Sequence, residues 1–435
     1  MRVLFVYPAF ERHAQAYPEL KEHVPCEEYI GSPSLGIASI AACTPKDVDQ
    51  AFVDDRIHPF EEGGWPEADL YAFSFFTPAA TRAMDLGDRL RAEGKTVVMG
   101  GIFPSMMPEE VAPHADAVVV GEGETVWPQL IADARAGTLK ARYQADEPAD
   151  LAKLPRPLVE LYLDAEDENF QPDDYPLQIS RGCPFNCDSC VIPCVMGRKI
   201  RFFPEETVWE TLKAFAARGK RCCLTEDTSL MFLSGARRRF RKLLRRIAEH
   251  REAEGIALSY IGTSMPLLLN LEDEIFEEIR AAGIERFYLV GGFDPITRAA
   301  FGPGDAKATE QAERCVKRCQ DAGVEPYVSF LVGNEEDDEG TFDRMLEFSN
   351  RVKLQIAEFA VATPYPGTPM WNKMIAEERI IDRTWRRYND TTVVFQPRNM
   401  SPERLQQGYL DLWRLFYESR QDLKMADRSL CTIQF

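Results

Sequence analysis

The hydrophobic pattern of this chain alternates along its length between two kinds of segment. Short runs rich in Val, Phe and Tyr, such as VLFVY at residues 3–7 and VVMGG at residues 97–101, are typical of buried strands. Longer amphipathic stretches, such as residues 79–94, separate these runs and have the apolar spacing of helices. Strands that alternate with helices of this length predict parallel sheets covered by helices, so we assign the chain to the α/β class.

One segment interrupts this alternation. Residues 145–157, ADEPADLAKLPRP, lack strand periodicity and are rich in proline, alanine and acidic side chains, as linkers are. We therefore predict a doubly wound, Rossmann-like domain at residues 1–144 and a linker at residues 145–174.

The alternation then resumes with six strand-like runs, which is two fewer than a closed eight-stranded TIM barrel has. We predict a (β/α)6 partial barrel at residues 175–384. Residues 385–435 form a small C-terminal appendage in this interpretation, with one helix that begins after Ser401 as N-cap and has Pro402 in its first position.

Composition and charge exclude several classes of function. The formal net charge of −19 would repel phosphate groups, which argues against nucleic acid and anionic membranes as partners. The one strongly basic run, residues 237–246, is interpreted as a solvated helix face. The apolar run at the N-terminus meets Pro8 and is too short for a signal peptide or a membrane span, so we expect a cytoplasmic protein.

Three of the 11 cysteines lie within the stretch RGCPFNCDSC, directly after a predicted strand. Cys183, Cys187 and Cys190 have the spacing C-x3-C-x2-C. A structural zinc site usually takes two pairs of ligands, and Cys194 is too close to belong to a second pair. Thiolates suit iron–sulfur clusters, which normally take four cysteines. Three would leave one iron without a protein ligand, and an open metal position is where a small molecule binds and reacts.

This cysteine loop, placed after the first strand of a six-stranded barrel, resembles that of the radical S-adenosylmethionine (SAM) superfamily. The resemblance spans about residues 175–383. It implies a [4Fe-4S] cluster bound by Cys183, Cys187 and Cys190, with SAM chelated at the fourth iron and its C–S bond cleaved reductively. It also implies an electron donor such as flavodoxin or ferredoxin.

Other segments resemble landmarks of the same superfamily. YLVGGFDP, from residue 288, is similar to the glycine-rich end of the fourth strand, and PYPGT, from residue 364, is similar to the segment after the sixth strand that contacts adenine. Relatives usually carry an aromatic residue where this chain has Ser189, which leaves open the pose of the adenine and which C–S bond is cleaved. The residues implied to lie at SAM are Ser189, Gly291, Gly292, Asp294, Pro364, Tyr365, Pro366 and Gly367.

Two acidic residues are candidates for catalysis. Glu226 and Asp227 follow the second predicted strand of the barrel, at the end where barrels place their chemistry.

The N-terminal domain resembles the B12-binding domain of the cobalamin-binding subgroup of radical SAM enzymes, also called class B methylases. The resemblance covers about residues 1–136 and makes cobalamin a possible cofactor. The D-x-H-x-x-G signature of histidine-ligated cobalamin is absent, and His58, in the wrong spacing, is interpreted as an exposed loop residue. A domain that keeps the fold without the cofactor is the alternative. The residues implied to lie at cobalamin are Ser74, Thr77, Gly100, Gly101, Gly121 and Glu122.

These resemblances favour cobalamin-dependent methylation of an unactivated carbon in a small-molecule substrate. A first alternative is transfer of the 3-amino-3-carboxypropyl group of SAM, for example onto arsenic. Ser189 and the neighbouring thiols of Cys222 and Cys223 motivate it, because trivalent arsenic is thiophilic, although two adjacent strand residues more often point to opposite faces. A second alternative is a non-catalytic cobalamin or metal sensor.

Overall fold

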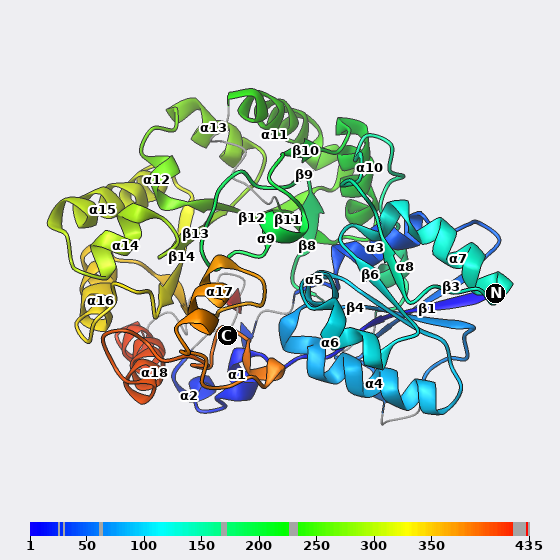
Figure 1. The fold of residues 1–435 in the computed structure, drawn as a ribbon. Coiled ribbons are helices and arrows are strands. Elements are labelled where there is room, and N and C mark those ends of the chain that lie inside the picture. The colour runs from blue at the N-terminus through cyan, green and yellow to red at the C-terminus, as the bar shows by residue number, and fades with distance from the viewer. Residues whose placement is uncertain are drawn as a thin grey trace.

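The computed structural model contains two α/β units that lie side by side (Figure 1). Each unit is built on a six-stranded sheet. The structure describes residues 1–24, 27–28, 31–60, 64–166, 172–225, 234–420 and 432–433.

The N-terminal unit is a parallel sheet with the strand order β3-β1-β4-β5-β6-β7. Its apolar residues form two separate clusters, one on each face, as a doubly wound sheet requires. The strands are β1 (Arg2–Tyr7), β3 (Asp49–Asp54), β4 (Leu70–Ser74), β5 (Val97–Gly100), β6 (Ala117–Val120) and β7 (Arg142–Gln144).

The two faces of this sheet carry different helices. Helices α3 (Leu35–Ala42) and α7 (Trp127–Ala136) contribute to one apolar cluster, whereas α4 (Ala80–Ala92) contributes to the other. Shorter elements follow the strand ends on the barrel side: η2 (Thr77–Ala79), α5 (Ile102–Met106), α6 (Pro108–Val111) and η4 (Gly123–Thr125). The short η3 (Ala112–His114) leads into the start of β6.

The second unit is an open parallel sheet with the order β15-β14-β13-β12-β11-β8, which confirms the predicted partial barrel. Apolar side chains of its strands pack outward against a layer of helices in the largest apolar cluster of the described residues. The strands are β8 (Tyr175–Gln178), β11 (Arg221–Thr225), β12 (Ala257–Ser264), β13 (Arg286–Gly291), β14 (Glu325–Val332) and β15 (Ile356–Val361).

The helices of this unit follow the strands in alternation. The basic run lies on α11 (Ser234–Glu254), where Arg241 pairs with Glu278 and Arg246 pairs with Glu206 of neighbouring helices. The basic run is therefore a helix face with acidic partners. The helices of the barrel are α9 (Ile192–Val195), α10 (Glu205–Ala216), α11 (Ser234–Glu254), α12 (Met265–Leu268), α13 (Asp273–Ala281), α14 (Pro295–Phe301), α15 (Ala306–Asp321), α16 (Thr341–Arg351) and α17 (Pro369–Ala376). Helix α8 (Glu160–Leu163) precedes the first barrel strand and contacts β3 and α3 of the N-terminal unit.

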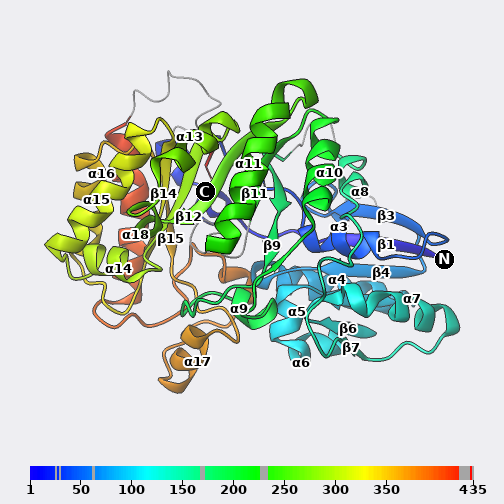
Figure 2. The same ribbon diagram turned by 90° about the horizontal axis from the view of Figure 1, so that it is seen from above.

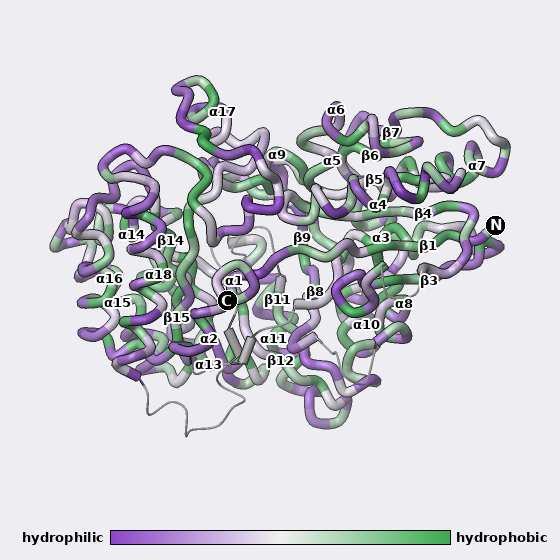
Figure 3. The backbone as a smooth tube through the Cα atoms, turned by 90° about the horizontal axis from the view of Figure 1, so that it is seen from below, coloured by the Kyte–Doolittle hydropathy of each residue, from purple (hydrophilic) through white to green (hydrophobic). Residues whose placement is uncertain are grey.

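The C-terminal part adds η5 (Trp385–Arg387) and the helix α18 (Pro402–Glu418). The Ser401 hydroxyl accepts from the Arg404 N–H at 3.1 Å, so the predicted N-cap is confirmed. None of the described helices combines the length and apolar character that a membrane crossing requires. Apolar segments concentrate along the central strands, while the outer helices alternate in hydropathy (Figure 3).

The segment after β1 leaves the N-terminal unit and reaches the barrel. Its helices α1 (His13–Ala16) and α2 (Leu20–His23) lie beside α18 (Figure 1), and Tyr409 of α18 lies 3.2 Å from the His13 ring nitrogen. Further along, β2 (Glu27–Glu28) pairs with β16 (Thr432–Ile433), and Gly31 bridges to Asp174 beside β8. The two units are therefore interlocked.

Candidate functional site

The cysteine loop is an excursion from the first barrel strand, closed by a short antiparallel pair. The strands β9 (Ser180–Arg181) and β10 (Arg201–Phe202) form this neck, and residues 182–200 form the loop. Gly182 has φ +91° there, and a Cβ atom would lie 2.3 Å from the Lys199 carbonyl oxygen. Only glycine fits this position. β9 and α9 lie between the two units (Figures 1 and 2), which places the loop at their junction.

The three predicted cluster ligands lie together on this loop. Cys183 is buried and its N–H donates to the Gly197 carbonyl at 3.1 Å, whereas Cys187 and Cys190 are partly exposed. Burial, and then the nearby Cys183 thiol, raise the pKa of Cys187. Among the described residues, no three Cys, His, Asp or Glu side chains stand close enough to form a metal site. Each thiolate of a [4Fe-4S] cluster binds a different iron, so the three cysteines need not converge on one point, and their donor chemistry fits such a cluster.

Segments predicted to lie at SAM surround the loop. The Met370 N–H, just after PYPGT, donates to the Asp188 carbonyl at 2.8 Å. Ser189 and Gly292 line one small cavity of about 150 Å³, together with Asn334 and Met370. The structure thus brings the cysteine loop and the ends of the fourth, fifth and sixth barrel strands together.

Asp294 lies at this edge but is occupied by its own helix. Its carboxylate accepts from the N–H groups of Ile296 and Thr297 at 2.9 and 3.0 Å and from the Thr297 hydroxyl at 2.6 Å, which makes it the N-cap of α14. Its charge also contributes to the raised pKa of Cys187, after burial and nearer groups, so it lies near the cysteine loop.

The PYPGT segment joins the barrel to the N-terminal unit. Pro364 and Pro366 are buried, and Tyr365 packs partly against the apolar cluster that contains α4. Gly367 has φ +80°, and the Met106 side chain of α5 fills the place of a Cβ atom. Gly291 is buried at the end of β13. The two catalytic candidates, Glu226 and Asp227, lie outside the described residues.

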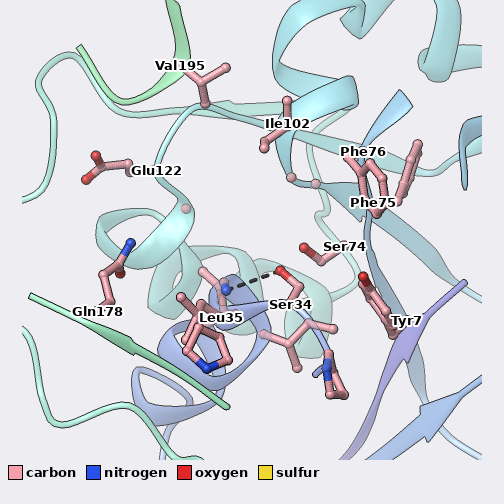
Figure 4. A pocket seen from close by; sticks show the side chains of 18 of the residues that line it. Tyr7, Ser34, Leu35, Ser74, Phe75, Phe76, Ile102, Glu122, Gln178 and Val195 are labelled. Carbon is pink, nitrogen blue, oxygen red and sulfur yellow. Dashed lines mark hydrogen bonds between the residues drawn. The ribbon is translucent and has the colours of Figure 1, made fainter. Parts of the chain in front are cut away.

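A cavity of about 520 Å³ lies between the carboxyl ends of the N-terminal strands and the barrel (Figure 4). This volume is in the range of small-molecule sites. Five of the six residues predicted at cobalamin line it, whereas Thr77 is buried at the start of η2 and is not among the lining residues. The five are Ser74, Gly100, Gly101, Gly121 and Glu122.

Three glycines, Gly100, Gly101 and Gly121, contribute to one wall of this cavity. Gly101 has φ +105°, and a Cβ atom there would lie 2.7 Å from both the N and the O of Phe75. The Ser105 hydroxyl donates to the Gly101 carbonyl at 2.6 Å and accepts from the Gly121 N–H at 2.9 Å, which ties the ends of β5 and β6 together. Such a glycine-lined wall allows a ligand to approach the backbone closely, as a bound nucleotide tail requires.

The barrel supplies the opposite wall. Gln178, Cys223, Thr225 and Tyr260 line the cavity, whereas Cys222 is part of the apolar cluster behind the sheet. Burial raises the pKa of Cys223 to about 11 and raises that of Cys222 well above the usual value of a thiol. The two thiols therefore point to opposite faces, as strand alternation dictates, and do not form a pair.

Several residues of the site were not predicted, among them Gln178, Thr225 and Tyr260 of the barrel wall. Arg181 and Arg201, at the neck of the cysteine loop, form buried ion pairs with Glu122, and Ser34 lines the cavity while its hydroxyl accepts from the Gly36 N–H at 3.2 Å (Figure 4). Arg181 adjoins the cysteine motif, which was a usable signal. No local pattern indicated Arg201. His58, by contrast, is exposed as expected.

Comparison with protein families decides the assignment. The model of the radical SAM superfamily matches residues 177–349, and that of the B12 binding domain matches residues 32–131. The chain is a radical SAM enzyme with a B12-binding domain. Radical SAM membership implies a [4Fe-4S] cluster and SAM as cofactors, and the second domain supports cobalamin.

Relatives of this radical SAM enzyme include two proteins of Chlorobaculum tepidum. Bacteriochlorophyllide d C-12(1)-methyltransferase is 24% identical over 90% of this chain and 84% of its own length. Bacteriochlorophyllide d C-8(2)-methyltransferase is 27% identical over 85% of this chain and 82% of its own length. Hopanoid C-2 methylase of Rhodopseudomonas palustris is 23% identical over 87% of this chain and 71% of its own length. These names support an enzyme that transfers methyl groups.

A solved structure has the same architecture. The radical SAM methyltransferase TsrM of Kitasatospora setae, with cobalamin and a [4Fe-4S] cluster bound, superposes with a TM-score of 0.64 at 16% identity, over 95% of this chain and 88% of that one. At this identity the match concerns the fold, and it confirms the arrangement of a B12-binding domain followed by a radical SAM barrel.

Proposed function

We propose that this enzyme is a cobalamin-dependent radical SAM methyltransferase that methylates an unactivated carbon of a small molecule. One observation carries the proposal: the glycine-lined cavity of the B12-binding domain opens onto the barrel wall and onto Ile192, Val195 and Met196 of the cysteine loop. A methyl donor held in that cavity would face the mouth of the barrel, where a substrate carbon can be reached from both cofactors.

The residues have separate roles in this proposal. Cys183, Cys187 and Cys190 hold the cluster, and the segments around Ser189 and Gly292 hold SAM against it. When bound, the cluster supplies the electron that cleaves SAM and cobalamin supplies the methyl group.

The cavity walls position the substrate and exclude water. The N-terminal wall offers backbone groups at Gly100, Gly101 and Gly121 to a corrinoid tail, while the barrel wall offers the amide of Gln178 and the hydroxyl of Thr225 to a substrate. A flavodoxin or a ferredoxin is the proposed electron donor, and a cytoplasmic location stays a prediction.

The experiment is anaerobic reconstitution with iron and sulfide, followed by addition of SAM, hydroxocobalamin and a reductant. We expect the absorption of a [4Fe-4S] cluster and of a bound corrinoid, and 5'-deoxyadenosine in the mass spectrum of the products. Cys187→Ala should abolish cluster absorption and SAM cleavage. Cys194→Ala is the matched control, because Cys194 is an exposed thiol of the same loop that the proposal leaves without a role, and it should retain both.

Two outcomes of this experiment would favour the alternatives. 5'-Methylthioadenosine as the SAM-derived product would indicate aminocarboxypropyl transfer, although the opposite orientation of Cys222 and Cys223 does not favour a thiol pair for arsenic. Binding of hydroxocobalamin without any SAM cleavage would favour a sensor. Stoichiometric zinc in place of iron and sulfide would overturn the assignment of the cysteine loop.

A further inference from the structure

The neck of the cysteine loop contains an unfavourable pair of like charges. Arg181 and Arg201 lie directly opposite each other in the register of β9 and β10. Like charges in such cross-strand positions repel, and a strand pair of only two residues per strand has little else to hold it together. Something outside the two strands must compensate these charges.

Glu122 of the B12-binding domain supplies that compensation. Its carboxylate accepts from Nη1 of Arg201 at 2.8 Å and also from Nη2 of Arg201, and lies 3.6 Å from Nη1 of Arg181. Glu124 adds a second carboxylate, 2.7 Å from the same Arg181 nitrogen. The side chain of Glu122 is 2% exposed and that of Arg181 is 4% exposed, so solvent does not screen these interactions.

The same residues are joined to both walls of the large cavity. Arg201 also donates to the carbonyls of Ala149 and of Met196, at 2.7 and 2.8 Å, and the Ala149 N–H donates to Glu122 at 3.0 Å. Met196 is part of the cysteine loop and lines the cavity. Glu122 follows Gly121, whose N–H is fixed by Ser105, and it is among the residues that line the cavity.

We propose that Glu122 is a positioning residue that fixes the neck of the cysteine loop to the wall of the corrinoid cavity and thereby couples the two sites. A ligand that orders the loop after β6 also orders Glu122, and Glu122 holds both arginines of the neck. By linkage, occupation of the cavity then stabilises the cysteine loop, and the formed loop favours occupation of the cavity. The coupling rests on the proposed function, whereas the anchoring of the neck does not.

Anchoring is tested in the protein without cofactors, by hydrogen–deuterium exchange of the peptides that cover residues 182–200. Glu122→Gln should accelerate exchange of these amides at least ten-fold, because the two guanidinium groups lose their shared carboxylate. Glu278→Gln is the matched control, since it removes a carboxylate that also serves two arginines, Arg241 and Arg245, but on the outer helices of the barrel. It should leave the loop unchanged. Equal exchange of the loop in both variants would overturn the anchoring.

A charge-balanced variant tests the coupling and avoids the risk that Arg201, left without a carboxylate, prevents folding. Glu122→Gln combined with Arg201→Gln removes one charge of each sign and leaves Arg181 paired with Glu124. Its loop should exchange nearly as slowly as that of the wild type. Saturating hydroxocobalamin should slow exchange of residues 182–200 at least three-fold in the wild type, and not in the double variant.

If Glu122 only stabilised the fold, hydroxocobalamin would slow exchange of the loop equally in the wild type and in the double variant. The same corrinoid-induced protection in wild type and double variant would overturn the coupling. If hydroxocobalamin does not bind to the wild type, both the coupling and the proposed corrinoid site are wrong, while exchange of the cofactor-free protein still decides whether Glu122 anchors the neck.

Discussion

Replacement of Gly101 by alanine tests whether the backbone of the large cavity needs glycine. At φ +105° and ψ −164° the backbone is in a region that residues with a Cβ atom rarely adopt, at a cost of about 1–3 kcal/mol. The added methyl group would also lie 2.7 Å from the N and O atoms of Phe75, which are backbone atoms of the neighbouring strand end and cannot rotate away. Relief of such overpacking costs about 1–3 kcal/mol more.

The expected destabilisation by Gly101→Ala is the sum, about 2–6 kcal/mol. Gly137→Ala is the matched control. Gly137 has φ +68° at the end of α7, but an added Cβ atom would meet no neighbouring atom within 4 Å. This substitution should cost only about 1–2 kcal/mol, the conformational term alone. Equilibrium urea unfolding monitored by circular dichroism measures both differences.

The affinity for hydroxocobalamin should also fall more in Gly101→Ala than in Gly137→Ala. Because the backbone around Gly101 has to shift, hydroxocobalamin should bind at least ten-fold more weakly to Gly101→Ala and equally well to Gly137→Ala, as measured by equilibrium dialysis. Equal losses of stability in the two variants would refute the steric argument. An unchanged affinity of a destabilised Gly101→Ala would show that this wall does not contact the corrinoid.

Three further predictions concern other residues of the structure. Burial raises the pKa of Asp337 to about 7, so the folded protein holds this proton more tightly than the unfolded chain does, and its stability falls as the pH rises from about 4 to 7. In urea unfolding, Asp337→Asn should therefore be up to about 4 kcal/mol more stable than the wild type at pH 8 and much less so at pH 5. A gain in stability that does not depend on pH would contradict this. Cys222 and Cys223 point to opposite faces, so phenylarsine oxide should not bridge them in the native protein, and a bridged adduct in the mass spectrum would revive the arsenic hypothesis. Ser34→Ala removes the N-cap of α3 and should cost about 1 kcal/mol in urea unfolding; no loss would show that the cap hydrogen bond adds nothing.

The sequence predicted both sheets because their signal is local. Each buried strand is a short apolar run and each helix has its own period, and the count of six runs after residue 175 was enough to indicate an incomplete barrel. The pattern of the cysteine loop was equally local, since its three predicted ligands lie within eight residues.

Features that depend on distant partners could not be predicted in this way. The composition of the segment with α1 and α2 does not indicate that it leaves the first domain and packs against α18, because the surface that it contacts exists only after the barrel has formed. The same holds for Arg201, whose partner Glu122 is 79 residues away. Glu122 was predicted from the family resemblance as a cofactor residue, and the sequence gives no indication of its ion pairs.

The cysteine loop is fixed at both of its ends. The ends are fixed by the β9–β10 pair, by the Gly182 turn and by the carboxylate of Glu122, and the three thiols lie on the chain between them. Metal binding supplies free energy that can gather ligands only if the chain between them is held short. Fixing the ends of residues 182–200 limits the volume that the thiols explore, and so lowers the entropy cost of bringing them to the cluster. A neck anchored in the other domain is therefore most useful in the enzyme before it is loaded.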